Sequence, residues 1–483
     1  MNMTAPQSNR TNIAYAVIAL SASAILYFLS TGLNGSWVLL FAAPIPILIF
    51  ANRAPARAAF MASFLAYAIG SLNMVDYLRM LIPITGIMIF VFLPSVVFAL
   101  SIISARAATF QLKPWLAAFA FPAVWTTYEF LPSLVSPNGT AGSIAYTQTD
   151  FLPLIQVASL TGIWGITFVV TMVPAAVAVL WHTRRSAKEM IRTASAPVIL
   201  VLSVLLFGSI RLSQPSSNRS ISVGLAASDT SIPHFRTTEP REALPVAEAY
   251  AHRAAQLTGN GAEIVVLPEK FVGITQKYDS TVYSIFEEAA NRGRAIIIAG
   301  FNDVQSPLSI NEAIVFSPLE ITLPYMKKYF VPGIETNYLP GNKPLIIQYD
   351  SLNMGVEICK DMDFPSWSRE YGGRDVKILF VPAWDFTLDG RLHSRMAIMR
   401  GVENGFAVVR CAQQGLLTVS DDKGRIISEK SSGAESMLLS SVSPGIGKTF
   451  YSKTGDWFAW LDAAFVVALI VSLSWYRKRS AAS

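Results

Sequence analysis

Three short motifs in the second half of the chain supply a carboxylate, an ammonium and a thiol. Glu269 ends Val-Val-Leu-Pro-Glu, Lys327 lies in Tyr-Met-Lys-Lys-Tyr-Phe-Val-Pro, and Cys359 ends Gly-Val-Glu-Ile-Cys. A thiol nucleophile needs a base that removes its proton and a positive group where the oxyanion develops. These three side chains can fill those roles, so the motifs predict acyl-transfer chemistry at a cysteine.

Each of these residues also has an ordinary structural interpretation. A lone glutamate is usually a solvated carboxylate, and a double lysine such as the pair at 327–328 is most often a solvated turn. A cysteine on an apolar strand is more often an inert core residue, and we assign Cys411 to packing for that reason. Cys359 differs because Lys360 and Asp361 follow it directly. This change to charged residues places the sulfur at the boundary between core and solvent, where a thiolate can form.

The composition indicates a membrane protein. Of the 483 residues, 52% are hydrophobic and 14% are charged, whereas soluble domains carry about 25% charged residues. Eight apolar runs approach the ~20 residues that span a bilayer, at residues 12–30, 36–51, 58–77, 82–104, 115–134, 155–181, 194–210 and 457–476. Seven runs precede a polar segment and one follows it. The seventh is short and begins near Pro197.

The positive charges predict the orientation of these spans. Arg10, the loops at 53–57, 106–113 and 182–192, and the basic tail at 477–479 alternate so that they fall on one side. The positive-inside rule then puts both termini in the cytoplasm and the polar segment outside. Orientation accounts for much of the +6 net charge, so the charge does not indicate nucleic-acid binding.

The polar segment is long enough for one globular domain with its own core. Strand-like apolar runs occur at residues 221–226, 263–267, 295–299, 313–316, 354–358, 377–381 and 407–410, with helix-like stretches at 239–257 and 281–292. This mixture predicts an α/β domain with strands buried on both faces. We expect a transmembrane domain at 1–217, a catalytic domain at 218–445, and a transmembrane helix with a basic cytoplasmic tail at 446–483.

The sequence lacks the motifs that metal-binding, serine-hydrolase, phosphate-binding and dinucleotide-binding sites require. The four histidines are scattered, and no His, Cys and carboxylate cluster has zinc-like spacing. There is no Gly-x-Ser-x-Gly elbow, phosphate-binding loop or dinucleotide fingerprint. We therefore expect neither a metal nor a cofactor. A Cys–His dyad using His393 remains open, although a loop histidine lining the site is the simpler interpretation.

The order and flanks of the three motifs resemble the Glu-Lys-Cys set of the nitrilase superfamily, and most closely its membrane-bound branch, the apolipoprotein N-acyltransferase family. The stretch 325–332 followed by Glu335, and the stretch 355–365, are similar to that family's lysine and cysteine motifs. The residues at 383–386, His393 and the stretch 399–403 are similar to its later elements. The Tyr-Thr-Gln, Pro-Leu-Ile-Gln and Thr-Gly-Ile-Trp-Gly stretches within 146–165 are similar to its membrane signature.

The resemblance implies an αββα sandwich inserted before the last of eight spans. It also implies transfer of a fatty acyl chain from a phospholipid to the amine of a lipoprotein's diacylglyceryl-cysteine, at the bacterial inner membrane with the catalytic domain on the periplasmic side. We expect Glu269 to act as general base, and Lys327 to stabilise the oxyanion with the backbone N–H of Lys360. Glu335 would orient Lys327 or the incoming amine. Candidate substrate contacts are Trp367, Trp384, Phe386 and His393.

Three departures from the family pattern concern the substrate. Lys360 stands where the family has an aromatic residue, Asp361 replaces a glutamate, and Pro132 replaces an arginine. The alternative function is a membrane-tethered nitrilase-like amidase that acts on a small amide or nitrile, with water as the second nucleophile. A catalytically inactive binding protein is disfavoured because Glu269, Lys327 and Cys359 are all present. For Trp367, packing within the domain is the alternative to substrate contact.

Overall fold

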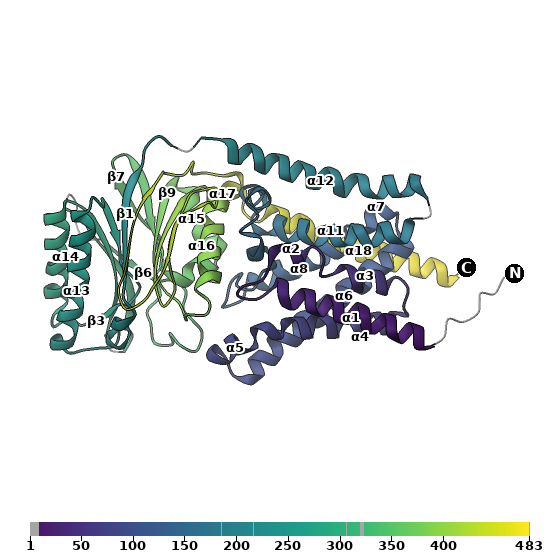
Figure 1. Cartoon of the computed structure of the whole chain (residues 1–483), viewed down its shortest axis with the longest axis horizontal. Helices are drawn as coiled ribbons and strands as arrows, with labels where there is room; N and C mark the ends of the chain where they lie inside the picture. The colour runs from purple at the N-terminus through teal and green to yellow at the C-terminus, as the bar shows by residue number, and fades with distance from the viewer. Residues whose placement is uncertain (1–8, 185, 216, 306, 319–322, 483) are drawn as a thin grey trace.

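The computed structural model describes residues 9–184, 186–215, 217–305, 307–318 and 323–482. The side chains of Arg10 and of residues 477–479, which entered the orientation argument, lie outside the described part. A helical part and a part with two sheets lie side by side, and both ends of the chain lie at the end of the helical part that faces away from the sheets (Figure 1).

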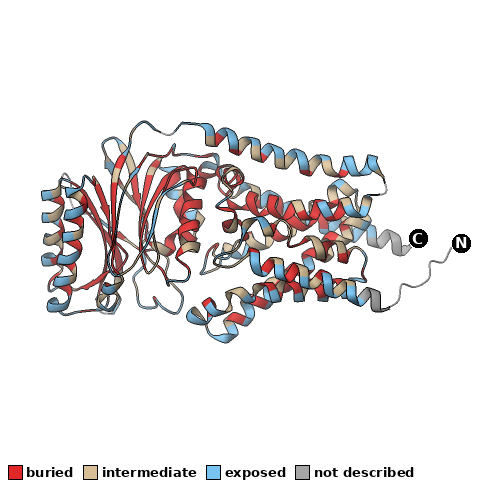
Figure 2. Cartoon of the chain, viewed as in Figure 1, coloured by how far each residue is buried: buried red, intermediate tan, exposed pale blue. Residues whose placement is uncertain are grey.

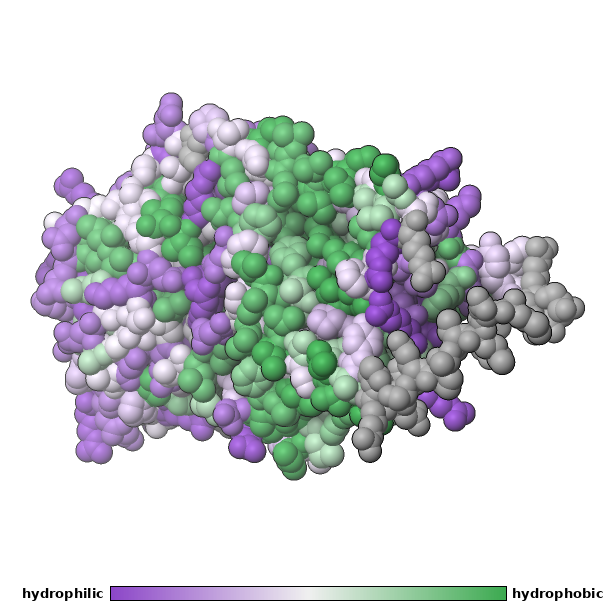
Figure 3. Space-filling view, turned by 45° about the vertical axis from the view of Figure 1, so that its right-hand side comes forward, coloured by the Kyte–Doolittle hydropathy of each residue, from purple (hydrophilic) through white to green (hydrophobic). Residues whose placement is uncertain are grey.

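The helical part is built from apolar helices. They are α1 (Asn9–Ser30), α2 (Trp37–Leu40), α3 (Ile45–Ala51), α4 (Ala56–Gly70), α5 (Val75–Leu81), α6 (Ile84–Gln111), α7 (Pro114–Ala117), α8 (Ala120–Ser133), α9 (Leu152–Ile155), α10 (Ala158–Thr161), α11 (Ile163–Thr183), α12 (Ala187–Ser213) and α18 (Trp457–Ala482). The 3₁₀ turns η1 (Ser71–Met74) and η2 (Ile144–Gln148) join some of them. Large hydrophobic side chains such as Ile18, Ile89 and Leu206 are exposed on this part, and Figure 3 shows hydrophobic residues gathered over it. Such a surface suits contact with lipid.

In the described residues, six helices are long and apolar enough to cross a membrane: Ile13–Ser30, Ala56–Leu81, Ile84–Gln111, Ile163–Thr183, Ala187–Ser213 and Trp457–Tyr476. Two of the eight predicted spans are shorter than expected. The run at 36–51 is divided into α2 and α3, with Pro44 before α3, and the run at 115–134 is divided into α7 and α8. The seventh is longer than expected, because α12 begins at Ala187 and continues through Pro197.

Two sheets form the other part. The first has the order β13-β1-β2-β4-β5-β6, with β3 also paired to β4, and the second has the order β12-β11-β10-β9-β8-β7. The strands are β1 (Ile221–Ala227), β2 (Ile264–Val266), β3 (Val272–Ile274), β4 (Ile296–Asp303), β5 (Ile310–Phe316), β6 (Leu323–Met326), β7 (Leu345–Tyr349), β8 (Leu352–Val356), β9 (Val376–Trp384), β10 (Ala407–Gln413), β11 (Leu416–Ser420), β12 (Ile426–Ser431) and β13 (Ser436–Val442). Their inner faces form a core that includes Leu225, Val266 and Phe380.

Helices cover the outer faces of both sheets. The pair α13 (Pro240–Gly259) and α14 (Asp279–Gly293) lies outside the first sheet, and α15 (Pro365–Gly373) and α16 (Gly390–Asn404) lie outside the second (Figure 1). The predicted αββα arrangement is therefore confirmed. Its central strands β1, β2 and β4, and β8, β9 and β10, run parallel, which explains their nearly continuous Ile, Val and Leu runs.

Helix α16 joins the sandwich to the helical part. Its residues are almost all buried (Figure 2). Ala397 packs with the buried residues of the sandwich, whereas Met396, Met399 and Val402 pack with the core of the apolar helices. Helix α16 thus helps to hold the sheet that carries Cys359 against the helical part.

Candidate active site

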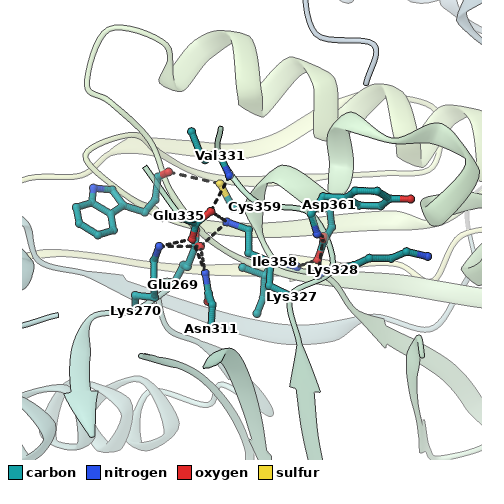
Figure 4. A network of polar contacts seen from close by, with 12 residues as sticks. Glu269, Lys270, Asn311, Lys327, Lys328, Val331, Glu335, Ile358, Cys359 and Asp361 are labelled. Atoms are coloured by element: carbon teal, nitrogen blue, oxygen red, sulfur yellow. Dashed lines mark hydrogen bonds and ion pairs between the residues drawn. The ribbon is translucent and has the colours of Figure 1, made fainter. Parts of the chain in front are cut away.

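Glu269, Lys327 and Cys359 come together where strands end. Glu269 follows β2, Lys327 follows β6 directly, and Cys359 follows β8. β2 and β8 are members of the parallel central strands, and α/β proteins place site residues outside the carboxyl ends of such strands. Figure 4 shows the three side chains pointing toward one another from the two facing sheets.

Lys327 is clamped between two carboxylates. Its Nζ lies 2.8 Å from Glu269 Oε1 and 2.8 Å from Glu335 Oε2. The amide of Asn311 donates to both carboxylates, at 2.6 Å to Glu269 and 2.9 Å to Glu335. Burial lowers the pKa of Lys327, but the two carboxylates outweigh it and hold that pKa above its usual value. The ammonium is therefore a fixed positive charge.

A second ammonium completes the cluster. Lys270 makes a short hydrogen bond to Glu335, and its Nζ lies 3.7 Å from Glu269 Oε1. Burial alone raises the pKa of Glu335, yet Lys327 and Lys270 together hold that pKa well below its usual range. The cluster therefore contains two carboxylates and two ammoniums, and each ammonium contacts both carboxylates.

Cys359 has an uncommon backbone conformation and a defined hydrogen bond. Its φ is 43°, in the left-handed region that non-glycine residues rarely adopt, and such residues cluster at active sites. Its thiol donates to the main-chain oxygen of Trp384 at 3.4 Å. Burial, followed by the charge of Glu269, raises the pKa of the thiol against the opposing charge of Lys327. The raised pKa keeps Cys359 protonated before substrate binds, so the thiol needs a base that removes its proton when it reacts.

Asp361 joins the cysteine to the lysine strand. It lies in the 3₁₀ turn Cys359–Asp363, which we call the cysteine turn. One of its carboxylate oxygens accepts from the main-chain N–H of Lys328 and of Tyr329, at 3.1 and 2.8 Å. The other accepts from the Tyr325 hydroxyl at 2.6 Å. Burial raises the pKa of Asp361 to about 6. Asp361, which stands where the resembled family has the longer glutamate, thus connects the cysteine turn to the chain on both sides of Lys327.

The cysteine turn also touches the helical part. The ammonium of Lys360 donates to Asp363 at 3.0 Å and to the Asn138 side chain at 3.2 Å. Asn138 lies in the loop after α8, next to Gly139 and Thr140. The side chain of Lys360 therefore bonds across the junction between the sandwich and the helical part. This lysine stands where the resembled family has an aromatic residue.

A small cavity of about 130 Å³ opens beside the cluster. It is lined by Cys359 and the charged cluster on one side and by apolar and aromatic residues on the other: Phe235, Val331, Ile334, Tyr338, Trp384 and Phe386. Arg236 also borders it. The cavity can hold the carbonyl of an ester or amide against the thiol, with an apolar wall for the attached chain.

The predicted substrate contacts are divided between this cavity and other places. Trp384 and Phe386 line it. Trp367 is 5% exposed, donates to the Tyr325 hydroxyl at 2.9 Å and packs against the ring of Tyr371. His393 does not line the cavity either: its Nε2 lies 3.1 Å from Asp389, and its other nitrogen lies 3.8 Å from Asp363.

The sequence patterns did not predict Lys270 and Asn311, whose contacts depend on how β2, β5 and β6 are aligned in one sheet. Cys411 is fully buried and its thiol donates to the Ala226 main-chain oxygen at 3.4 Å. Both cysteines are free thiols. Among the described residues, no group of three or more His, Cys, Asp or Glu is arranged to hold a metal ion.

Comparison with known proteins identifies both parts of the chain. Residues 23–176 match the family model of the apolipoprotein N-acyltransferase N-terminal domain, and residues 223–446 match that of carbon-nitrogen hydrolase. An amidase from Nesterenkonia sp. is a structural neighbour, with a TM-score of 0.40 and 16% identity over 48% of this chain and 94% of its own.

Relatives match both parts at once. The apolipoprotein N-acyltransferase of Geobacter metallireducens is 24% identical over 396 residues, 74% of each chain. That of Bradyrhizobium diazoefficiens is 25% identical over 403 residues, 74% of this chain and 73% of its own. A membrane domain and a nitrilase-like domain in this order, matched by the same relatives, place this chain in the apolipoprotein N-acyltransferase family.

Proposed function

We propose that this chain moves a fatty acyl chain from a phospholipid, through a thioester on Cys359, to the N-terminal amine of diacylglyceryl-cysteine lipoproteins. The observation that carries the proposal is the Glu269–Lys327–Glu335 clamp beside Cys359, in a domain anchored by apolar helices. The family supplies the substrate class, since its members are named apolipoprotein N-acyltransferases.

In the first half-reaction, Glu269 takes the proton of the Cys359 thiol. The sulfur attacks the ester carbonyl of the phospholipid, and the tetrahedral oxyanion is held by Lys327 and the backbone N–H of Lys360. When this intermediate collapses, the C–O bond breaks and Glu269 returns the proton to the departing oxygen. A lysophospholipid leaves and a thioester remains on Cys359.

In the second half-reaction, an amine replaces the lysophospholipid. Its nitrogen attacks the thioester carbonyl, Glu269 accepts the ammonium proton, and Lys327 again stabilises the oxyanion. The C–S bond breaks, and Glu269 passes its proton to the departing sulfur, so the thiol is restored as the amide forms. Glu335 keeps Lys327 in place through both steps, because Lys327 bonds to it at 2.8 Å.

The apolar wall of the cavity fits an acyl chain. Trp384 is the last residue of β9 and Phe386 lies two residues further on, and both border the cavity. A lipid ester can reach Cys359 while its tail contacts these rings. The protein is membrane-bound, and we further propose the bacterial inner membrane with the sandwich on the periplasmic side, since the loops at 53–57 and 182–192 carry the positive charges expected of the cytoplasm.

The proposal assigns three units to the chain: a transmembrane domain at 1–217, a catalytic domain at 218–445, and a last transmembrane helix with its tail at 446–483. The family matches at 23–176 and 223–446 lie within the first two of these units, apart from residue 446. The proposed function gives this chain three partners: the membrane bilayer, a phospholipid acyl donor and a lipoprotein acceptor.

Complementation tests the function. The chain is expressed while the host's own N-acyltransferase is depleted, and lipoprotein N-termini are read by mass spectrometry. Triacylated N-termini that vanish in Cys359→Ala support the proposal. Diacylated N-termini despite abundant, folded protein would reject the acceptor, and hydrolysis of small amides by the same preparation would favour the amidase alternative.

A further inference from the structure

Lys270 is a buried ammonium for which the proposed chemistry has no role. Its side chain is 7% exposed, and it follows Glu269 directly. Its φ is 47°, so the residue after the base and the nucleophile itself are both left-handed. Burying a charge and holding a lysine in a left-handed conformation both cost free energy. The contacts of Lys270 must therefore compensate for this cost.

The contacts of Lys270 point into the active site. It is hydrogen-bonded to the Oε1 oxygen of Glu335, while Lys327 takes the Oε2 oxygen. Its Nζ also lies over two rings of the cavity wall, 5.3 Å from the centre of Tyr338 and 5.5 Å from that of Trp384. Figure 4 shows Lys270 and Lys327 on either side of the carboxylates. Each oxygen of Glu335 therefore has its own cation.

The charge count explains why a second cation is useful. Glu269 and Glu335 carry two negative charges, and Lys327 alone would leave the cluster at −1. When Cys359 passes its proton to Glu269, the S–H bond breaks, an O–H bond forms, and the negative charge moves to sulfur. With Lys270 the cluster is neutral before and after this transfer. Without it, a thiolate would form in a negatively charged cavity, which is less favourable.

We propose that Lys270 is a positioning residue of the active site. Its ammonium fixes the Glu335 carboxylate that clamps Lys327, and its charge balances the cluster in which Cys359 becomes a thiolate. The assignment rests on the proposed roles of Glu269 and Cys359, and not on which donor or acceptor the enzyme uses.

The charged and titratable groups around Cys359 come from several elements. They are Glu269 and Lys270 after β2, Lys327 after β6, Glu335 and Tyr338 in the following loop, Arg236 at the cavity border, and the ion pair of Asp385 with Arg410. In this set, Lys270 contacts both Glu269 and Glu335. Its removal changes the charge of the cavity by one unit, whereas the other pairs stay intact.

Thiol alkylation tests this role without any lipid or lipoprotein. The full-length protein in detergent is treated with iodoacetamide from about pH 6 to 10, and alkylation is followed by intact mass. Lys270→Met is compared with Lys270→Arg, with the exposed lysine variant Lys343→Met as matched control, and with Cys359→Ser, which reports any reaction of buried Cys411.

We expect Lys270→Met to alkylate about tenfold more slowly near pH 7.5, because the loss of one positive charge raises the pKa of the Cys359 thiol by about one unit. Lys270→Arg should restore most of the neutral-pH rate, and Lys343→Met should follow the wild type. A Lys270→Met profile that overlies the wild type would overturn the proposal. An equal loss of rate in Lys270→Met and in Lys270→Arg would overturn it too, because that is an effect of packing rather than of charge.

Folding is controlled separately, because removing one partner of a buried ion pair costs stability. The apparent unfolding temperature of each variant is measured first, and Lys270→Gln replaces Lys270→Met if the latter is unfolded. Loss of the fold in all three substitutions would assign Lys270 to stability and reject the positioning role. Since the assay uses only the thiol, a normal result here with failed complementation would reject the substrate assignment and leave Lys270's role in place.

Discussion

Thr140, in the loop after α8, donates two hydrogen bonds to the main-chain oxygen of Asp363, at 2.9 Å from its N–H and 2.9 Å from its hydroxyl. Asp363 ends the cysteine turn. A loop of the helical part therefore fixes the turn that carries the nucleophile. The position of Cys359 is set by the junction with the helical part as well as by its own sheet.

Gly139 makes this junction sensitive to a single methyl group. Its φ is 51°, and a Cβ built there would lie 2.3 Å from the main-chain oxygen of Asp363. We expect Gly139→Ala to displace the cysteine turn and to lower acyl-thioester formation about tenfold or more, since small misplacements of catalytic groups are costly. Gly142→Ala is the matched control, because Gly142 also has a positive φ, 97°, but its Cβ would meet nothing within 4 Å. Equal loss in the two variants would contradict a specific role of the Gly139 contact.

Lys327 should be essential for chemistry. We expect Lys327→Met to lower acyl-thioester formation by about 10²-fold or more, because it removes the oxyanion's positive partner. The adjacent Lys328 provides the comparison: its Nζ lies 3.7 Å from the centre of the Trp367 ring, away from the cluster. Lys328→Met should stay close to the wild type. The readout is the intact mass of protein incubated with phospholipid, and comparable acylation of Lys327→Met would remove Lys327 from the mechanism.

Glu335 should matter for both stability and chemistry. Glu335→Gln leaves the two ammoniums of Lys270 and Lys327 against the single carboxylate of Glu269, and an uncompensated buried charge costs about 3–5 kcal/mol. We expect a lower apparent unfolding temperature and little thioester. Adding Lys270→Met to Glu335→Gln removes one of the unpaired charges, so the double variant should be more stable than Glu335→Gln alone. Additive destabilisation in this pair would mean that the two residues do not interact.

Phe386 should contribute to lipid binding and not to thiol reactivity. It lines the cavity at the end of β9. We expect Phe386→Ser to slow acylation from phospholipid about tenfold, as burial of an aromatic side chain against a lipid chain contributes a few kcal/mol at most. Alkylation of Cys359 by iodoacetamide should stay at the wild-type rate. A parallel loss of both reactions would assign Phe386 to packing.

His393 should make stability depend on pH. Burial lowers the pKa of this imidazole, but its hydrogen bond to Asp389 and the charge of that carboxylate outweigh burial and raise the pKa to about 8, from 6.5. Because the folded pKa is raised, the contribution of His393 is full below pH 6.5 and is lost as the pH rises through 8. It amounts to about 2 kcal/mol.

We therefore expect His393→Gln to lower the apparent unfolding temperature at pH 6 and to have little effect at pH 9. Asp389 also accepts a hydrogen bond from the Tyr77 hydroxyl at 2.7 Å, and the substitution leaves both partners of this bond unchanged. A loss that is the same at pH 6 and at pH 9 would contradict the ionic role of His393.

The apolar runs of the sequence predicted an α/β domain with strands buried on both faces, and the family resemblance implied the αββα sandwich. The seven expected runs coincide with β1, β2, β4, β5, β8, β9 and β10. The remaining strands were not predicted, and β12 shows why: its Ile426–Ser431 side chains are mostly exposed, so their pattern is set by pairing with β11 and not by burial. An edge strand of this kind has no hydrophobic signature.

The charged cluster was predicted only in part. Glu269 and Cys359 were predicted because each follows an apolar run, and Lys327 was predicted because the order and flanks of the three motifs resemble a family pattern. Lys270 and Asn311 have no such flanks, and their contacts depend on how β2, β5 and β6 are aligned in one sheet. Trp367 was proposed for substrate contact, but the Tyr325 hydroxyl accepts its N–H inside the domain, a contact between distant segments that sequence patterns do not reveal.

The most direct test of the account is a two-step acyl transfer on the purified enzyme. The full chain in phospholipid nanodiscs is analysed by intact mass before and after addition of a diacylglyceryl-cysteine peptide. We predict a fatty-acyl adduct on Cys359 that forms from lipid alone, disappears on addition of the peptide, and reappears as an amide on the peptide's N-terminus. An enzyme that never carries a fatty-acyl adduct, or an adduct that is lost only to water while the peptide stays unmodified, would contradict the account.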